Sequence, residues 1–322
     1  MNKDTLLTIS IVSSGDVNVL NRCLGLIFSE IGKDLSFEVY VVNNNSGLDT
    51  SNMVRAKYPQ VKLIENDRRR GFSENHNQVI RQSSGNHVLI MNPDVLIGDG
   101  FVDNLLEAIE REKSIGIVMG KLMRSPEEAT IDSTGLVILK SRRTVDRGQG
   151  EKDSGQYDRS CEIFSASGAA MLCRREILED IKLFGEYFDE SFKLYKEDLD
   201  LNWRARLRGW KVFYEPRAVA YHDRGWGAGT KRAAVPRWIR RESYKNRYLT
   251  IIKNDHLVNF FRDLPFILWH EIKALGYMVL REPHLFLVWP HILWQVPTAL
   301  RKRAEIMKKA VVKPEEIRKW FV

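Results

Sequence analysis

The chain has 322 residues and three cysteines, Cys23, Cys161 and Cys173, which are too few and too scattered for a disulfide framework or a zinc site. Apolar residues make up 43% and charged residues 29%, so the chain is globular rather than disordered. The net charge of +8 is concentrated at 231–247 and 301–322, which hold seven and eight Lys/Arg, and such blocks indicate an anionic partner: phosphate, nucleic acid or a lipid surface.

Strand and helix patterns alternate through the first 123 residues. The opening MNKDTLLTISIVSS holds a short apolar run that fits a first strand better than a signal peptide, so we expect a protein of the reducing cytoplasm. We expect strands at 8–12, 37–42, 61–65, 87–91 and 116–123, with helices at 18–31, 51–57, 73–83 and 100–113. This alternation predicts an α/β fold with a mostly parallel sheet flanked by helices.

Polar residues follow each of the first four expected strands. In open α/β sheets a ligand binds outside the carboxyl ends of the strands, so these positions predict one shared site. Each of these residue types is common in loops. Their occurrence after four strands at the same edge of the sheet is what favours a site. The candidates at this edge are Ser13, Ser14, Asn43, Asn45, Arg70, Gly71, Asn92 and Asp94.

Two familiar phosphate-binding motifs are missing from the sequence. No G-x-G-x-x-G follows the first strand, and no G-x-x-x-x-G-K-[ST] occurs anywhere. A dinucleotide oxidoreductase and a P-loop enzyme are therefore disfavoured.

Small residues interrupt a strand-like run in CEIFSASGAAMLCRR, at 161–175. Small side chains allow a ligand or a neighbouring strand to approach the backbone closely. Close packing explains Ala166, Ala169 and Ala170, whereas Gly168 is a candidate for lining an acceptor pocket.

A second group of carboxylates opens the segment 197–209. Acidic residues at its start, arginines near its end and a glycine beyond predict a helix whose charges complement the macrodipole. The alternating apolar positions also fit a strand, but Leu199, Trp203 and Leu207 form a helical stripe. Favourable first-turn charge explains acidic residues there in general. A Glu197–Asp198 pair among aromatic residues is less well explained that way, because its desolvation is costly.

The next segment, WKVFYEPRAVAYHDRG, is expected to form a strand, a turn and a second strand that ends at His222. A single histidine is more often structural than a ligand. This one ends a strand just before a basic, Trp-containing loop at 223–232.

Together these residues resemble a family 2 glycosyltransferase of the GT-A fold, most closely its rhamnosyltransferase-like branch. The resemblance runs from about residue 8 to residue 254. It rests on the spaced combination of VVNNNSGLD, GFSENHN, LIMNPDV, SGAAMLCRR, FDESFKLYKEDLDLNWRARLRGW and YEPRAVAYHDRG. The family implies a nucleotide-sugar donor, a divalent metal (Mg²⁺ or Mn²⁺), inversion at the anomeric carbon, and a saccharide or lipid-linked acceptor.

The resemblance also implies roles for individual residues. Asp94 matches the last carboxylate of the D-x-D-like metal motif, whose first position is Asn92, and His222 matches a histidine that completes the metal ligands in some relatives. Asp198 matches the catalytic base, with Glu197 beside it. The implied donor-binding set consists of the edge residues above together with Asn77 of GFSENHN, and Trp203 joins Gly168 on the acceptor side. Asn43 replaces a usual Asp, and Ser14-Gly15 replace a usual Tyr-Asn.

The proposed chemistry agrees with these residue types. When a nucleoside diphosphate leaves, negative charge develops on it and must be neutralised. A hard cation with oxygen ligands can neutralise that charge. An imidazole ligand such as His222 favours Mn²⁺ over Mg²⁺ but does not decide between them. The acceptor hydroxyl loses its proton as it attacks, and a carboxylate such as Asp198 can accept that proton.

The last part of the chain, 255–322, is apolar, aromatic and basic. Residues 283–300 carry no Asp, Glu, Lys or Arg, but prolines interrupt this stretch. We expect amphipathic helices lying in the membrane interface, with Trp at headgroup depth and Lys/Arg against anionic lipid. The alternative is a helical subdomain that packs on the core or on a dimer partner.

The sequence thus predicts an inverting, metal-dependent glycosyltransferase, peripheral on the inner face of the cell membrane, that moves L-rhamnose from dTDP-rhamnose during polysaccharide synthesis. We divide it into a glycosyltransferase domain, 1–254, and a helical region, 255–322. The domain has a nucleotide-sugar-binding half, 1–124, and an acceptor-binding half, 125–254. Alternatives are another hexosyl or galactofuranosyl transferase, an inactive sugar-nucleotide-binding module, and a nucleic-acid binder, disfavoured because no nucleic-acid module is recognisable.

Overall fold

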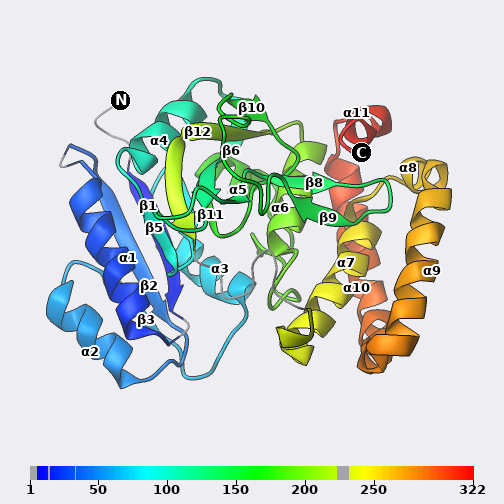
Figure 1. The fold of residues 1–322 in the computed structure, drawn as a ribbon, viewed down its shortest axis with the longest axis horizontal. Helices are drawn as coiled ribbons and strands as arrows, with labels where there is room; N and C mark the ends of the chain where they lie inside the picture. Colours follow the sequence, from blue (N-terminus) through cyan, green and yellow to red (C-terminus); the bar gives the residue numbers. More distant parts are fainter. Residues whose placement is uncertain (1–5, 14, 33, 223–231) are drawn as a thin grey trace.

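A ten-stranded sheet flanked by helices forms one side of the molecule, and a group of helices forms the other (Figure 1). The computed structural model describes residues 6–13, 15–32, 34–222 and 232–322. Ser14, one of the predicted donor-binding residues, and most of the basic loop at 223–232 lie outside the described residues.

The first part of the chain alternates strand and helix as predicted. Its elements are β1 (Leu7–Ser13), α1 (Val17–Glu30), β2 (Phe37–Asn43), α2 (Leu48–Lys57), β3 (Lys62–Glu65), α3 (Phe72–Gln82), β4 (His87–Met91), β5 (Val95–Ile97), α4 (Phe101–Glu110) and β6 (Ile115–Met123). Every residue of β4 and β6 is buried, in agreement with the apolar character of β4 and of most of β6; the exception, Lys121, pairs with Asp153 and Asp158. The helix expected at 100–113 ends earlier than predicted, at Glu110.

The middle part holds several short strands, two helices and the long strand β12. Its elements are β7 (Ile131–Ser133), β8 (Leu136–Ile138), β9 (Thr144–Asp146), β10 (Cys161–Glu162), β11 (Ala170–Arg174), α5 (Arg175–Asp180), α6 (Glu197–Leu207) and β12 (Lys211–His222). The helix predicted from the Leu199, Trp203 and Leu207 stripe is therefore present as α6.

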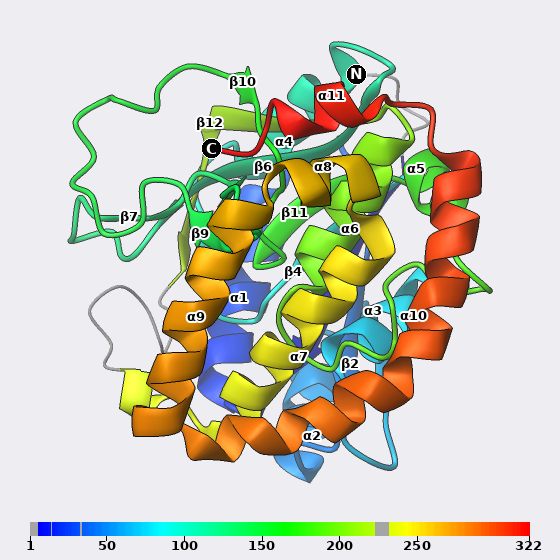
Figure 2. The same cartoon turned by 90° about the vertical axis from the view of Figure 1, so that its right-hand side faces the viewer.

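The last part is helical. Its elements are η1 (Arg232–Ala234), α7 (Arg237–Asn254), α8 (Leu257–Arg262), α9 (Leu264–Arg281), η2 (Pro283–Val288), α10 (Trp289–Lys309) and α11 (Pro314–Arg318). Pro297 does not interrupt α10, although the sequence suggested a break there. α9 and α10 run along either side of α7 in the side view (Figure 2).

The sheet has the order β10-β12-β6-β11-β4-β1-β2-β3, with β5 paired to β12 and β7 paired to β6. β3, β2, β1 and β4 are mutually parallel, so their carboxyl ends meet at one edge. β11 is antiparallel to both β4 and β6, and β12 is parallel to β6. The carboxyl end of β12, with His222, therefore lies at the same edge as that of β4.

Two features of this region differ from the sequence prediction. The segment expected to form a strand, a turn and a strand is the single strand β12, with an irregular register between Glu215 and Val219. Pro216 lies in that irregular stretch, where a missing N–H is tolerated because the ladder is already broken. The short strand β5 was not predicted, and its pairing with β12 brings the two ends of these strands together.

The C-terminal region packs against the sheet domain through aromatic and ionic contacts. The ring of Trp203 on α6 lies edge-on to Phe321, with ring centroids 5.6 Å apart. Arg142 is fully buried and pairs with Asp255 at 2.7 Å and Asp263 at 2.8 Å. The region from 255 onward therefore completes a hydrophobic cluster of the preceding domain.

Candidate active site

Strand β5 brings Asp94 to His222. Val95, the first residue of β5, pairs with His222 at the end of β12, so the residue before it lies beside the histidine. Asp94 Oδ1 lies 3.4 Å from His222 Nε2. The two residues proposed as metal ligands, far apart in sequence, are thus neighbours.

Asp132 of β7 completes the arrangement on the other side of the histidine. Its Oδ2 lies 2.9 Å from His222 Nδ1, and both side chains are buried. Burial alone would lower the pKa of His222, but its hydrogen bonds to Asp132 and Asp94 outweigh burial and raise the pKa to about 9. His222 is therefore held between two carboxylates, and a metal ion would bind its Nε2 only by displacing the proton that this pKa keeps on the ring at neutral pH.

The Asp94–His222 pair fits a divalent cation. Two ligand atoms at right angles on an octahedral ion, each about 2.1 Å from it, are about 3.0 Å apart, close to the separation of Asp94 Oδ1 and His222 Nε2. A carboxylate on the outer ring nitrogen, as Asp132 provides, orients metal-binding histidines. Within the described ranges no group of three or more His, Cys, Asp or Glu side chains could hold a metal.

Asp198 stands at the start of α6, after a turn with unusual backbone geometry. Tyr195 and Lys196 both have positive φ, 66° and 71°, which is unfavourable for side chains with a Cβ. Asn246 of α7 holds this turn by donating from Nδ2 to the carbonyls of Leu194, at 3.0 Å, and Tyr195, at 2.8 Å. The strained turn fixes where the helix, and its first carboxylates, begin.

Two backbone N–H groups hold the carboxylate of Asp198. Gly168 donates to Oδ2 at 3.0 Å and Leu199 donates to Oδ1 at 2.7 Å. Burial raises the pKa of Asp198, and these hydrogen bonds oppose that rise. The result is a fixed, half-buried carboxylate that is more basic than an ordinary aspartate.

The neighbouring Glu197 is in a different state. It is 5% exposed, and its Oε2 accepts no hydrogen bond from a described group. Burial and the charge of Asp198 raise the pKa of Glu197 well above its usual value. Since both carboxylates cannot ionise easily together, Asp198 is the member of the pair suited to accept a proton.

The loops after β2 and β3 are joined by side-chain amides. Asn43 donates to Gly47 O at 2.9 Å and to Ser51 Oγ at 2.7 Å, while its Oδ1 accepts from Ser46. Asn44 Oδ1 accepts from the backbone N–H of Arg70 at 2.8 Å, and Asn44 Nδ2 donates to the Arg70 carbonyl. These bonds shape the carboxyl edge of the sheet.

The other predicted donor-binding residues lie at or near this edge. Ser13 is buried at the end of β1, and Asn45 is exposed with a positive φ of 53°. Asn92 begins the turn between β4 and β5, where its carbonyl accepts from Val95. Gly71 lies beneath the loop at 189–196, since an added Cβ would be 2.8 Å from Lys193 Cα. Direct contact of these residues with a donor stays a prediction.

Two predicted contacts require correction. Asn77 is fully buried, and its amide bonds to both backbone groups of Phe188 and to Glu190, so it fixes a loop instead of reaching a donor. Trp203 is also fully buried, between Phe164 and Phe321, so it is a core residue and cannot contact an acceptor. Both residues lie in sequence motifs that suggested a role in binding, but their side chains are fully buried and cannot reach a ligand.

Asp132 is the site residue that sequence reasoning missed. It lies in IDSTG, where the strand and helix pattern is loose, and no spacing rule connects it to His222. Nothing local marks it, because Ser133 and Thr134 beside it are polar and its burial in β7 is evident only from the structure.

The profile of the glycosyltransferase-like family 2 matches residues 5–244, about three quarters of the chain. The chain belongs to this family. The family 2 glycosyltransferase is 26% identical over 220 residues to the N-acetylglucosaminyl-diphospho-decaprenol L-rhamnosyltransferase of Mycobacterium tuberculosis, covering 61% of this chain and 69% of the relative. It is 24% identical over 190 residues to the poly-beta-1,6-N-acetyl-D-glucosamine synthase of Staphylococcus epidermidis, covering 57% of this chain and 42% of that relative.

Solved structures show the same fold. The structure of S. aureus TarS 1-349 in complex with UDP-GlcNAc matches with a TM-score of 0.61 at 16% identity, covering 94% of this chain and 83% of that one. The mannosyltransferase PcManGT from Pyrobaculum calidifontis, in complex with GDP-Man and Mn²⁺, matches with a TM-score of 0.54 at 17% identity, covering 98% and 82%. The predicted GT-A fold, with a helical C-terminal extension, is therefore confirmed.

Proposed function

We propose that this glycosyltransferase is inverting and metal-dependent, and that it transfers L-rhamnose from dTDP-rhamnose to a lipid-linked saccharide in cell-surface polysaccharide synthesis. The observation that carries the proposal is the pairing of Asp94 with His222, oriented by Asp132, at the carboxyl edge of a sheet whose other loops are polar. The rhamnosyltransferase of M. tuberculosis, which is similar over most of the chain, supports the sugar and the acceptor class.

The proposed reaction is a single displacement. The acceptor oxygen attacks the anomeric carbon, the bond from that carbon to the diphosphate oxygen breaks, and the acceptor proton passes to Asp198. Asp94 and His222 would hold the divalent cation, which, when bound, supplies positive charge beside the departing diphosphate. Asn92, Asn45, Arg70 and the loop backbone would bind the donor.

A transferase for N-acetylglucosamine is the second candidate. It is favoured by the S. epidermidis synthase and by TarS, whose structure contains UDP-GlcNAc. A screen of nucleotide sugars with Mn²⁺, measuring release of nucleoside diphosphate, separates the two. We expect release from dTDP-rhamnose above that from UDP-GlcNAc, and the reverse order would replace rhamnose with N-acetylglucosamine in the proposal.

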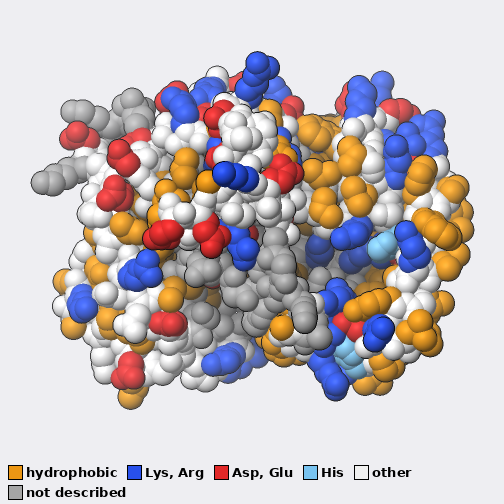
Figure 3. All heavy atoms as spheres, in the orientation of Figure 1, with side chains coloured by type: hydrophobic (Ala, Val, Ile, Leu, Met, Phe, Trp, Pro, Cys, Tyr) orange, Lys and Arg blue, Asp and Glu red, His pale blue; other side chains and the backbone are white. Residues whose placement is uncertain are grey.

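We also propose that the protein lies on the inner face of the membrane through α8, α9 and α10. No helix in the described part of the chain is both long and apolar enough to cross a bilayer. These helices instead expose large apolar side chains among Lys and Arg (Figure 3). The most exposed are Leu257, Phe261, Trp269, Ile272, Leu280, Leu293 and Trp294, each more than 60% accessible. Exposed apolar side chains interspersed with basic ones suit anionic lipid.

Sedimentation with anionic liposomes tests the membrane proposal. Because the C-terminal region packs into the domain, substitutions are preferable to truncation. We expect Ile272→Glu to lower the bound fraction several-fold, whereas Leu48→Glu, at an even more exposed position on α2, leaves it unchanged. Binding should fall as salt rises without vanishing, since salt does not screen apolar burial. Full-length protein that stays in the supernatant at low salt would refute the membrane proposal.

A further inference from the structure

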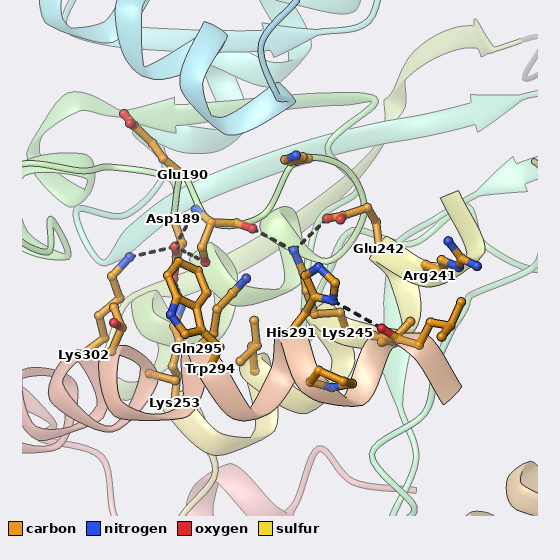
Figure 4. A pocket seen from close by; sticks show the side chains of 18 of the residues that line it. Asp189, Glu190, Arg241, Glu242, Lys245, Lys253, His291, Trp294, Gln295 and Lys302 are labelled. Carbon is orange, nitrogen blue, oxygen red and sulfur yellow. Dashed lines mark hydrogen bonds and ion pairs between the residues drawn. The ribbon is translucent and has the colours of Figure 1, made fainter. Parts of the chain in front are cut away.

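A cavity of about 1000 Å³ lies between α7, η2 and the first half of α10, and the loop at 189–193 closes one side (Figure 4). In the close-up, His291, Trp294 and Gln295 of α10 face the loop that carries Asp189 and Glu190. The cavity is separate from the Asp94–His222 pair and shares no lining residue with it. Its size is that of a binding site for a small molecule or part of a larger one.

The acidic groups of the cavity already have cationic partners. Asp189 pairs with Lys253 and, at 2.7 Å, with Lys302. Glu242 pairs with Lys245 at 2.8 Å. Glu190, the third lining carboxylate, pairs outside the cavity with an arginine of α3. None of these carboxylates needs a ligand for its charge.

Two lining cations have no carboxylate partner among the described residues. Arg241 donates from Nε to the carbonyl of His284 at 3.2 Å, which leaves the charge of its guanidinium unneutralised. Lys193 is exposed and takes part in no ion pair within the described ranges. With the acids paired internally, the cavity has positive charge to offer an anion.

The other wall of the cavity is apolar and continues into the exposed face of α10. Leu287 and Trp294 line it and are 61% and 79% accessible, and Pro290 and Ala299 also line this wall. Gln295 adds a buried Oε1 that accepts no hydrogen bond from a described group. The cavity therefore combines an anion-attracting side, an unused acceptor and an apolar exit toward the proposed membrane surface.

The loop that closes the cavity leads directly to the proposed base. Lys193 precedes Asp198 by five residues, so their Cα atoms are at most about 18 Å apart. On its other side the same loop contacts the donor edge, because Phe72 N–H donates to Lys193 O at 2.8 Å. The loop that lines the cavity is thus continuous with the segment that carries Asp198 and touches the donor edge.

We propose that this cavity binds the diphosphate and the first part of the lipid chain of the acceptor, a saccharide linked through diphosphate to a long-chain lipid alcohol. Arg241 and Lys193 contact the diphosphate, Trp294 and Leu287 contact the chain, and the chain leaves along α10 into the bilayer. The saccharide then extends past the loop toward Asp198. This inference rests on the proposed function, since it assigns the acceptor of that same reaction.

Calorimetric titration of the full-length protein with farnesyl diphosphate tests the assignment without any transfer reaction. We expect Arg241→Glu to weaken binding by about tenfold or more, because it removes a charge-assisted contact and adds repulsion. Trp294→Ala, an exposed side chain whose loss does not threaten folding, should weaken binding several-fold. The matched control is Arg281→Glu, an exposed cation of α9 that does not line the cavity and should leave binding within twofold.

Two results would overturn the assignment. Unchanged binding in both Arg241→Glu and Trp294→Ala would place the probe elsewhere, and equal weakening by Arg281→Glu would show attraction to the whole basic surface. Donor binding by the same wild-type preparation separates this inference from the proposed function. If the protein binds dTDP-rhamnose but not farnesyl diphosphate, only the assignment of the cavity is refuted. If it binds farnesyl diphosphate but not dTDP-rhamnose, the proposed donor is refuted.

Discussion

Replacing Asp132 with asparagine is the most informative change at the proposed metal pair. The substitution preserves the shape of the side chain and removes one of the two negative charges beside His222. In the native protein Asp132 Oδ2 lies 2.9 Å from His222 Nδ1, and both groups are buried. An asparagine in its place can present either its oxygen or its amide to that nitrogen, so it no longer fixes the orientation of the ring.

The expected size of the effect follows from this geometry. Loss of a carboxylate that orients a metal-binding histidine typically weakens metal affinity by about 10–100-fold, or roughly 1.4–2.7 kcal/mol. Asp94 remains, so we expect weakened binding rather than abolition. The assay is Mn²⁺ binding by electron paramagnetic resonance, with the Mn²⁺ dependence of nucleoside diphosphate release as a second readout.

One result would show that Asp132 has no such role. If folded Asp132→Asn protein binds Mn²⁺ as tightly as the native protein does, then Asp132 does not orient a ligand. His222→Ala serves as the reference, because it removes the ring itself and should weaken Mn²⁺ binding at least as much.

Three further outcomes are expected. Gly168→Ala should slow turnover more than it weakens donor binding, since the added Cβ would lie 3.3 Å from Asp198 Cβ, whereas Gly276→Ala, where a Cβ meets nothing, should leave kinetics unchanged. Trp203→Ala should lower the free energy of unfolding by about 3–5 kcal/mol in urea titrations, and a loss below 1 kcal/mol would contradict its core position. Burial raises the pKa of Asp198 above the ordinary aspartate value of about 3.9, so the loss of kcat/KM on acidification should have its midpoint above that pH. A midpoint below about 3.9 would exclude Asp198 as the base.

Much of the sheet could be predicted from the sequence because its central strands are mostly apolar. β1, β2 and β4 were located within a residue or two, and with them the edge at which Asn43 and Asp94 lie. A buried parallel strand has a strong local pattern, and the rule that ligands bind at carboxyl ends does not depend on details of packing.

The rest depended on contacts between distant segments. β5 has only three residues, too few for a periodic pattern, yet its pairing with β12 brings Asp94 to His222. Trp203 appeared available for an acceptor because nothing local reveals that Phe321, from the end of the chain, covers it. Pro297 appeared to break a helix, but α10 continues through it.

The cavity between α7 and α10 was equally hidden in the sequence. The basic block at 231–247 indicated an anionic partner, but the sequence could not show which cations would already be paired. Only the folded chain distinguishes Lys245, paired with Glu242, from Arg241, which has no described carboxylate partner.

The proposed reaction requires that Asp198 accepts the acceptor proton while other residues bind the donor. Turnover of Asp198→Asn, measured together with calorimetric donor binding on the same preparation, tests it most directly. We expect donor affinity close to that of the native protein and a rate lower by about 10²–10⁴-fold, the usual cost of losing a general base. Folded Asp198→Asn protein that transfers sugar at nearly the native rate would contradict the claim.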